Sequence, residues 1–477
     1  MTTITIIWLL SPLLFGIGLY LVPKLAQYIA LTISLLSMGY ALALMITPEW
    51  YGSWQLLDSF GITFVTDALS SYFILTNALV TIAVVLFSWQ SGKTAFFYVQ
   101  LMIVHASVNT VFICADFITL YVALELLGIA VFLLIAYPRT ERSIWLALRY
   151  LFVSSAAMLF YLIGAILVYQ SSNSFAFEGL DQGSSEAVVL ILLGLLTKGG
   201  IFILGFWSPL TNSESETSVS ALLSGIVEKG AVFPLVRLTL MLDDLNWIII
   251  LFGVGTVYLG VTYAIFEEDT KGTLAFSTFS QLGWILVAPT VGGFYALAHG
   301  LAKAAIFFIT DLLPSRNFNT LQNKSVQTGV WVALVIPCLS ISGFPLVTGF
   351  GAKMLTLDNL LPPLPTVVMD VAAIGTAVVY AKFIFLPRGG QTPIKTSILI
   401  SLVFLMGGLI IGNYLVYEAY TLFNVGKAII IVLSGWLGYF LIKQWLGFGL
   451  PRNLENFEHL IGIMSLTVVG LLGIVLA

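Results

Sequence analysis

The chain has 477 residues, of which 59% are hydrophobic and only 9% are charged, and its mean hydropathy is +1.03. A water-soluble domain carries about 25% charged residues, so this composition excludes a soluble enzyme and predicts a membrane protein. The formal net charge is −4 with no basic stripe, which excludes nucleic acid as a partner. The two cysteines, Cys114 and Cys338, lie in apolar segments, so we expect no disulfide framework, no metal site and no cofactor.

Apolar windows of about 19 residues divide the chain into sixteen segments, each near the roughly 20 residues that a helix needs to cross a bilayer. They lie near residues 4–22, 26–46, 67–89, 95–115, 117–137, 144–169, 186–207, 217–240, 246–266, 271–291, 294–314, 327–356, 364–386, 396–417, 426–445 and 457–477. The first segment has no charged leading region and no cleavage motif, so we expect a retained helix. The sequence therefore predicts an all-α polytopic membrane protein.

The positively charged residues test this segmentation, because lysine and arginine collect on the cytoplasmic side of a membrane. Eleven of them lie on odd-numbered connections: Lys24, Lys93, Arg139, Arg142, Lys271, Arg316, Lys324, Arg388, Lys395, Lys443 and Arg452. The even-numbered connections carry only Lys427. A miscounted helix in the middle would scramble this division. The distribution therefore favours sixteen segments and predicts that both termini lie outside the cytoplasm.

Seven ionisable residues fall well inside the apolar segments: Glu125, Lys198, Glu228, Lys229, His299, Lys303 and Lys353. A charge at the centre of a bilayer costs roughly 2.5 to 3.5 kcal/mol on insertion scales, so such residues normally face a polar interior and line an ion path. We expect these side chains to be paired with one another or hydrated inside the helix bundle. The pattern favours ion translocation.

Glu125 lies nine residues after Asp116, at which its helix begins, so we expect it near the middle of the membrane. It either belongs to an ion path or merely neutralises a neighbouring lysine. Lys198 precedes Gly199 and Gly200, which can loosen the helix and free backbone carbonyls. The alternative is a glycine packing site beside a lysine that reaches the membrane surface. That lysine would be too far from either end of its helix, so we favour the functional interpretation.

Glu228 and Lys229 are neighbours in sequence, so on a helix they point about 100° apart and are expected to contact different partners. The alternative is a local ion pair that shields one lysine. His299 and Lys303 are four residues apart and therefore share one helical face, where they could form successive stations of a proton path. A buried histidine alone is more often a satisfied core residue, and the lysine one turn away favours the functional interpretation.

Lys353 follows a stretch that four residues interrupt: Gly343, Pro345, Gly349 and Gly351. Such a broken helix is typical of transporters, in which exposed backbone near the midplane lines an ion site. The alternative is an ordinary proline kink with Lys353 at the membrane edge. Three further charged residues near segment ends are expected to act mainly as anchors: Arg149, Arg237 and Lys382.

The charged positions also indicate an internal repeat. An offset of 155 residues links Lys198 to Lys353 and Glu125 to Ser280, and an offset of 153 links Lys229 to Lys382. The offset spans five predicted helices, an odd number, so the second copy would enter the membrane in the opposite direction, as in many transporters. We therefore expect N-terminal helices in 1–94, inverted repeats in 95–240 and 246–388, and C-terminal helices in 394–477.

Six stretches carry a family resemblance: DFITLYVALEL with Glu125, LLTKGGIF with Lys198, SVSALLSGIVEKGAVFPLVRL with Lys229, FSTFSQLGWIL, HGLAKAAIFF with His299, and SGFPLVTGFGAK with Lys353. Over about residues 60–390 the chain resembles the antiporter-like subunits shared by respiratory complex I and the multi-subunit cation/proton (Mrp) antiporters. With lysine rather than glutamate at position 353, the chain looks more like an Mrp D-type subunit, or certain complex I subunits, than like the complex I subunit that carries glutamate there.

The resemblance implies fourteen core helices in two inverted five-helix units, with helices 7 and 12 broken. It also implies proton transfer along a central hydrophilic axis through the counterparts of Glu125, Lys198, Lys229, His299 and Lys353, to which we add Lys303 for its place on the same helical face as His299. The last two segments, 426–445 and 457–477, exceed the fourteen.

We therefore expect an ion-translocating subunit of a cation/proton antiporter in a prokaryotic or related energy-coupling membrane, with no hydrolytic catalytic residues. Glu125 would modulate Lys198 by pairing with it. The expected partners are other membrane subunits, protons and monovalent cations. A complex I-type pumping subunit is the first alternative and a non-conducting scaffold subunit is the second. A stand-alone organic-solute carrier is disfavoured because the axis offers chiefly titratable groups.

Overall fold

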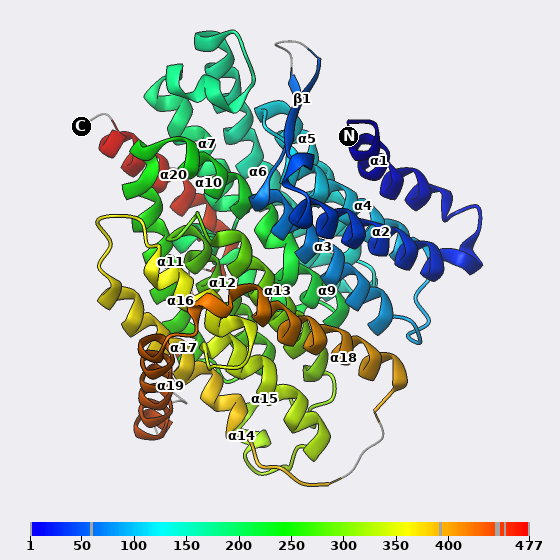
Figure 1. Cartoon of the computed structure of the whole chain (residues 1–477), viewed down its shortest axis with the longest axis vertical. Helices are drawn as coiled ribbons and strands as arrows, with labels where there is room; N and C mark the ends of the chain where they lie inside the picture. Colours follow the sequence, from blue (N-terminus) through cyan, green and yellow to red (C-terminus); the bar gives the residue numbers. More distant parts are fainter. Residues whose placement is uncertain (1, 58–60, 391–393, 444–448, 453–454, 476–477) are drawn as a thin grey trace.

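The structure is a computed structural model that describes residues 2–57, 61–390, 394–443, 449–452 and 455–475. Its helices pack into one bundle (Figure 1). The first part comprises α1 (Thr2–Gly18), α2 (Ala26–Ile46), strands β1 (Gly52–Leu57) and β2 (Gly61–Thr66), α3 (Ala68–Phe87), α4 (Ala95–Ile113), α5 (Phe117–Ile135) and α6 (Glu141–Ser172). Four short 3₁₀ turns lie in connections: η1 (Pro23–Leu25), η2 (Pro48–Trp50), η3 (Phe177–Gln182) and η6 (Asp243–Leu245).

The middle and last parts are helical along nearly their whole length. The middle part comprises α7 (Ser185–Lys198), the 3₁₀ turn η4 (Phe202–Gly205), α8 (Trp207–Glu214), α9 (Thr217–Leu222), the π-helical turn η5 (Leu223–Val227), α10 (Glu228–Met241), α11 (Asn246–Phe266), α12 (Thr270–Leu286) and α13 (Gly292–Thr310). The last part comprises α14 (Phe318–Leu321), α15 (Thr328–Ser342), α16 (Thr348–Asp358), α17 (Thr366–Ile384), α18 (Thr396–Ile411), η7 (Gly412–Ala419), α19 (Leu422–Ile442) and α20 (Phe457–Val475).

Each of the sixteen predicted segments coincides with a helix or with an interrupted helix. By length and composition, 11 helices of the described chain can cross a membrane, or up to 12 if the bent pair Ser185–Lys198 and Phe202–Glu214 is one span. Three apolar helices are shorter: Thr3–Gly18, Thr328–Ser342 and Glu458–Gly473. The chain is therefore a multi-pass membrane protein, and the number of its crossings stays a prediction.

The fold explains why Lys427 did not follow the distribution of positive charge over the odd-numbered connections. Lys427 lies within α19 and not on a connection, and its ammonium group lies 2.9 Å from the carboxylate of Asp370 on α17. Both side chains are partly buried between the two helices. An ion pair inside the bundle does not report on which side of the membrane a loop lies, so Lys427 is not an exception to that pattern.

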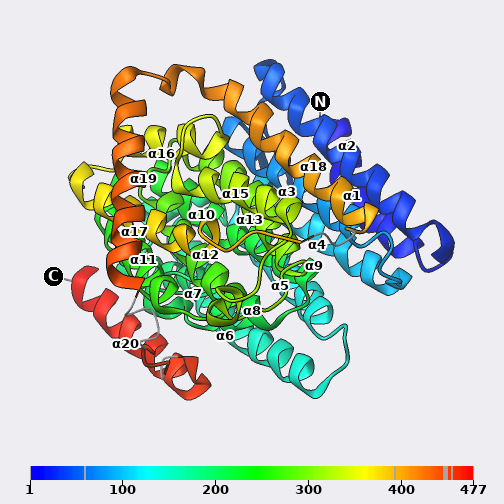
Figure 2. The ribbon, with the colours of Figure 1, turned by 90° about the horizontal axis from the view of Figure 1, so that it is seen from below.

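The centre of the bundle is formed by α13 and by the run from α9 through η5 to α10. The apolar windows of Thr217–Met241 and Gly292–Thr310 are 100% buried, whereas those of Pro23–Ile46 and Leu422–Ile442 are 39% and 28% buried. Figure 2 shows α1, α2 and α18 along one side of the molecule and α20 at the opposite edge. The most buried helices are those that carry most of the predicted ionisable residues.

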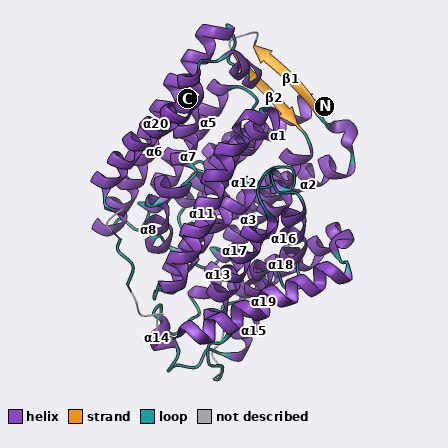
Figure 3. Cartoon of the chain, turned by 90° about the vertical axis from the view of Figure 1, so that its left-hand side faces the viewer, coloured by secondary structure: helices purple, strands orange, loops and turns teal. Residues whose placement is uncertain are grey.

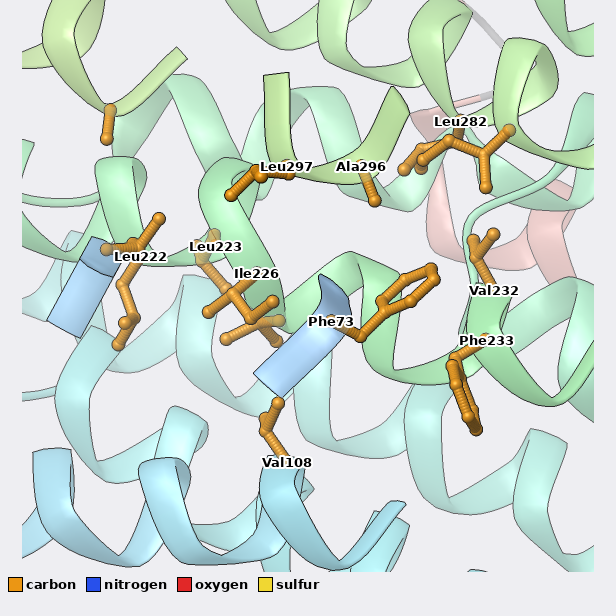
Figure 4. Close-up of a cluster of buried hydrophobic side chains, with 14 of the residues drawn as sticks. Phe73, Val108, Leu222, Leu223, Ile226, Val232, Phe233, Leu282, Ala296 and Leu297 are labelled. Atoms are coloured by element: carbon orange, nitrogen blue, oxygen red, sulfur yellow. The ribbon is translucent and has the colours of Figure 1, made fainter. Parts of the chain in front are cut away.

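Apolar side chains fill the space between these central helices and their neighbours. In Figure 4, Leu223 and Ile226 of η5 lie beside Leu297 of α13. The ring centroid of Phe73 on α3 lies 5.0 Å from that of Phe233 on α10. Such packing fixes the positions of α10 and α13, and with them the polar side chains that the two helices carry.

An all-α chain is expected from the sequence, and the structure differs after α2, where strands β1 and β2 pair as an antiparallel sheet (Figure 3). Its register pairs Gly52 with Thr66 and Trp54 with Phe64. Two strands of six residues are too short to register in a window chosen for membrane helices. The sheet lies at the edge of the bundle and leads into α3.

The first break in the bundle separates α7 from α8. The backbone turns at Gly200, whose φ is +67°, and a Cβ atom on Gly205 would lie 2.3 Å from the Gly200 carbonyl oxygen. The Thr197 carbonyl oxygen accepts from the Gly200 amide at 3.1 Å and from the indole nitrogen of Trp207 at 2.8 Å, so a backbone and a side-chain donor both meet it at the break. The two halves are bent by 43°. The expected break next to Lys198 is therefore present.

The second break separates α15 from α16. Gly343 has a φ of +81°, and a Cβ atom on Gly349 would lie only 1.8 Å from the Ser340 carbonyl oxygen. The amide nitrogen of Gly349 accordingly donates to the Ser340 hydroxyl at 3.1 Å. Lys353 follows this break, whereas Lys198 precedes the first one. Both interruptions were expected, and the inverted repeat that would relate them stays a prediction.

Candidate functional site

The six predicted site residues come from five helices. Glu125 lies on α5, Lys198 ends α7, Lys229 lies on α10, His299 and Lys303 lie on α13, and Lys353 lies on α16. Glu125 is half-buried, and each of the other five side chains is at most 5% exposed. Buried ionisable groups need polar partners, so the contacts of each one show how the fold accommodates it.

The ammonium group of Lys198 is held by α5 and α6. It donates to the Leu124 carbonyl oxygen at 3.1 Å and also to the hydroxyl of Ser154. A Cβ atom on Gly128 would lie 3.0 Å from the lysine nitrogen, so the missing side chain at this position lets the ammonium group approach α5 closely. The ammonium group of Lys198, the last residue of α7, is therefore held by polar groups of α5 and α6.

Glu125 lies next to this pocket without closing an ion pair. The hydroxyl of Ser155 donates to one of its carboxylate oxygens at 3.5 Å, and the other oxygen has no partner among the described residues. In the described part of the structure, neither carboxylate oxygen of Glu125 lies within 4.0 Å of the Lys198 ammonium nitrogen. The two groups do interact electrostatically, so Ser154 and Ser155 hold apart a lysine and a glutamate that attract each other.

Glu228 and Lys229 contact different partners, as the helical geometry predicts. The Lys229 ammonium group donates to the carbonyl oxygens of Ser224 and Gly225 at 2.8 and 2.7 Å. Both carbonyls belong to the π-helical turn η5. In a π-helix the backbone hydrogen bonds join residues five apart rather than four, so the usual α-helical pairing of these carbonyls is changed. Glu228 points instead to α8, where Ser208 and Asn212 donate to one of its oxygens.

Lys303 lies deep in α13 against α12 and α17. Its ammonium group donates to the Leu274 carbonyl oxygen at 2.8 Å and lies 5.5 Å from the ring centroid of Tyr380. It interacts electrostatically with both Glu228 and Lys229, and His299 interacts with Lys229 and Lys303. The structure therefore brings α10 and α13 residues into one electrostatic group.

His299 and Lys353 face one small cavity of about 10 Å³, roughly the space that one water needs. Both ring nitrogens of His299 and the Lys353 nitrogen lack a hydrogen-bond partner among the described residues. Lys353 lies 4.8 Å from the ring centroid of Trp284. The cavity is also lined by polar side chains of three helices: Gln281, Tyr295 and Ser340. The α13 histidine and the α16 lysine thus line one small shared cavity.

Sequence reasoning missed the polar residues that hold the charged ones. Ser154, Ser208 and Asn212 are buried and contact Lys198 or Glu228. In a membrane helix a serine hydroxyl commonly bonds back to its own backbone, as Ser107 does to Ile103. A polar residue in an apolar segment therefore indicates a possible contact with a buried charge, but the sequence does not show which charged residue it contacts.

Three charged residues that were expected to be anchors are held by protein groups. Lys382 donates to the carbonyl oxygens of Ala264, Ile265 and Glu267 at the end of α11, where a cation is favourable. Arg149 donates to the Glu455 carbonyl oxygen, just before α20. Arg237 donates twice to Asp67, at 2.8 and 3.2 Å. These residues anchor helices to one another inside the bundle.

A bundle of apolar helices with two broken members and a buried group of lysines, a histidine and carboxylates defines an ion-translocating class of membrane protein. The family model described as "NADH:quinone oxidoreductase/Mrp antiporter, TM" matches residues 114–379. The chain belongs to this family, which confirms the resemblance inferred from the motifs.

Similar proteins fall into two groups. The D-type subunit of the Na⁺/H⁺ antiporter of Alkalihalophilus pseudofirmus is 24% identical over 340 residues, covering 65% of this chain and 68% of the relative. NAD(P)H-quinone oxidoreductase subunit 5 of Piper cenocladum is 28% identical over 62% of this chain and 46% of the relative. The putative antiporter subunit mnhA2 of Staphylococcus saprophyticus is 26% identical over 87% of this chain. The match covers 61% of the Staphylococcus protein and 46% of the Piper protein. This chain therefore spans only about half of the length of these two relatives.

Two solved structures share the fold. A chain of the archaeal membrane-bound sulfane sulfur reductase has a TM-score of 0.77 at 19% identity, covering 91% of this chain and 99% of that one. A chain of the Mrp complex from Dietzia sp. has a TM-score of 0.75 at 20% identity, covering 96% of this chain and all of that one. The all-α fold predicted from the sequence is thereby confirmed.

Proposed function

We propose that the chain is an ion-translocating membrane subunit of a multi-subunit cation/proton antiporter. The observation that carries the proposal is the set of six titratable side chains on five helices, five of them buried and one half-buried, with two of these helices bordering a break. The relatives named as Na⁺/H⁺ antiporter subunits support the same function. The partners would be other membrane subunits, and the transported species would be protons and monovalent cations.

In this mechanism, protons move through Glu125, Lys198, Lys229, Lys303, His299 and Lys353. The Ser154 hydroxyl and the Leu124 carbonyl oxygen hold the Lys198 ammonium group apart from Glu125. Movement of the carboxylate toward the lysine would hold a proton there, and movement away would release it toward Lys229. Each proton that crosses against 100 mV stores about 2.3 kcal/mol, a scale that one rearranged ion pair can supply.

The positive charges support an orientation in which both termini lie outside the cytoplasm. The division into two inverted repeats, 95–240 and 246–388, would give two half-channels that open to opposite sides. They would meet where η5 and α13 lie side by side at the centre of the bundle.

The assignment is tested by proton flux into vesicles that carry the whole complex. Lys198→Ala removes the titratable group at the first break and is expected to lower flux at least tenfold. Lys24→Ala, at an exposed lysine between α1 and α2, is the matched control and keeps wild-type flux. Wild-type flux in Lys198→Ala would refute the proposal.

A complex I-type pumping subunit is the second candidate, favoured by the relatives named as quinone oxidoreductase subunits and by the fold shared with a respiratory complex. The subunits that co-purify with the chain decide between the two. Redox subunits favour the pump and companion antiporter subunits favour the antiporter. A scaffold that conducts nothing would instead assemble and leave transport unaltered after replacement of Glu125 and Lys353.

A further inference from the structure

Glu228, the first residue of α10, is a buried carboxylate outside the six proposed proton carriers. Its side chain is only 4% exposed. One carboxylate oxygen accepts hydrogen bonds from the hydroxyl of Ser208 and from the amide of Asn212, the latter at 3.1 Å. The other oxygen has no hydrogen-bond partner among the described residues. A buried carboxylate with a free oxygen is costly when ionised, so this group is poised to take up a proton.

The positive groups around Glu228 come from two helices. It interacts electrostatically with Lys229 on its own helix and with Lys303 on α13. Lys229 does not close an ion pair with it, because the lysine ammonium group is held by the Ser224 and Gly225 carbonyls of η5. In Figure 4, η5 lies directly beside α13. Glu228 therefore stands at the point where the α10 and α13 lysines come together.

On its other side, Glu228 reaches toward the first break. A Cβ atom on Gly200 would lie 3.3 Å from the Ser208 Cβ atom, so the serine that donates to Glu228 packs on the backbone turn that follows Lys198. The fully buried phenol of Tyr150 interacts electrostatically with both Glu125 and Glu228. Glu228 is thus linked through Ser208 to the turn that follows Lys198, and it interacts electrostatically with Lys229 and Lys303.

Building on the proposed function, we propose that Glu228 is a proton carrier that links Lys198 to Lys229. A proton released on the Lys198 side adds to the Ser208 hydroxyl oxygen as that hydroxyl gives its own proton to the Glu228 carboxylate. The Lys229 amine, once it has lost its own proton and has left the η5 carbonyls, then takes the proton from this carboxyl group. Glu228 ends as a carboxylate and Lys229 as an ammonium group, so charge and protons balance at each step.

A purely structural role for Glu228, tying α8 to α10, makes a different prediction. Glu228→Gln keeps the oxygen that accepts from Ser208 and Asn212, and it removes only the capacity to bind a proton. Glu228→Asp keeps that capacity on a shorter side chain. A structural tie would therefore survive the glutamine better than the aspartate, whereas a proton carrier would behave in the opposite way.

The experiment measures proton transport against pH in vesicles that carry the whole complex. Glu228→Gln is expected to slow transport about tenfold or more, on the scale of lost proton-transfer groups. Glu228→Asp restores part of the rate with a displaced pH profile. Glu186→Gln, the same change at the exposed start of α7, keeps the wild-type rate. A wild-type rate and pH profile in Glu228→Gln overturn the inference, provided that Lys198→Ala slows transport at least tenfold.

If Lys198→Ala also transports normally, the proposed function fails, and Glu228 is then judged by infrared difference spectra of the purified complex between two pH values. A carboxyl band that Glu228→Gln removes supports a titrating Glu228, and a spectrum unchanged by the substitution overturns it. Should Glu228→Gln fail to assemble, Ser208→Ala leaves the carboxylate in place and removes the relay hydroxyl. It is expected to slow transport to the same degree, and an unchanged rate would contradict the relay.

Discussion

The ammonium group of Lys198 donates to the hydroxyl of Ser154 and not to the carboxylate of Glu125. The next residue along α6, Ser155, donates to Glu125 instead. Two adjacent serines on one helix thus hold the two charged groups at separate positions. These two contacts keep Lys198 and Glu125 on separate partners, and under the proposed function they give α6 a part in transport.

Ser154→Ala is therefore expected to slow proton transport about tenfold or more, because a hydrogen bond to a charged group contributes about 1.5–3 kcal/mol. Ser154→Thr keeps the hydroxyl and should keep most of the rate. The measurement is proton flux in vesicles with the whole complex. Ser107→Ala, whose hydroxyl bonds only within its own helix, is the matched control. Equal flux in Ser154→Ala and the control would contradict a role for this contact.

The second break depends on Gly349. A Cβ atom there would lie 1.8 Å from the Ser340 carbonyl oxygen, so Gly349→Ala forces α15 and α16 apart. We expect a loss of about 1–3 kcal/mol in stability, the usual cost of overpacking, seen as a lower thermal unfolding temperature of the detergent-purified complex. Gly329→Ala, on α15 with open space around it, should unfold like the wild type. A wild-type unfolding temperature for Gly349→Ala would show that the close approach does not exist.

The cavity between His299 and Lys353 offers a steric test. Ala352 lines this cavity, and Ala352→Leu would fill a space of about 10 Å³. Without room for a water between the histidine and the lysine, we expect proton flux to fall about tenfold or more. Ala333→Leu on α15, at a partly exposed position, makes the same change away from the cavity. If the two variants transport equally well, protons do not pass through this space.

The ion pair between Asp67 and Arg237 joins the start of α3 to α10. Burial, the largest single effect, would raise the pKa of the Asp67 carboxyl, but the charge and hydrogen bonds of Arg237 together with Ser70 lower it below its usual value. Because the pKa is lower in the folded chain, the stabilisation is complete above about pH 4 and is lost only as the pH falls through that lowered pKa.

Asp67→Asn should therefore lower the thermal unfolding temperature of the complex by the same amount at pH 7 and at pH 5. The expected loss of stability is small, about 1 kcal/mol, because the carboxylate is partly exposed and screened by solvent. Asp358→Asn, at an exposed position that ends α16, is the control. A difference that vanishes between pH 7 and pH 5 would contradict the lowered pKa.

Much of the fold follows from local rules. Long apolar windows place the long helices but not the short α8 and α14. The glycines after Lys198 and before Lys353 predict both breaks, because backbone turns of this kind favour glycine. Residues 228 and 229 point to different partners simply because they are neighbours on a helix. These features need no knowledge of which helix packs on which.

The contacts of the site could not be predicted because they join residues far apart in sequence. Lys198 meets Ser154 of α6, 44 residues earlier, and nothing in the sequence distinguishes this serine from Ser107. The π-helical turn that presents the Ser224 and Gly225 carbonyls to Lys229 is equally hidden, since the sequence around it follows an ordinary helical pattern. Tertiary packing alone decides these partners.

The central claim is that protons pass in series through Lys198 and Lys353. Proton flux in vesicles carrying the whole complex, compared among Lys198→Ala, Lys353→Ala and the double variant, tests it most directly. Each single change is expected to lower flux at least tenfold, and the double change should lower it no further, because two blocks on one route do not add. Separate losses that add in the double variant, or wild-type flux in either single variant, would contradict a single path through both lysines.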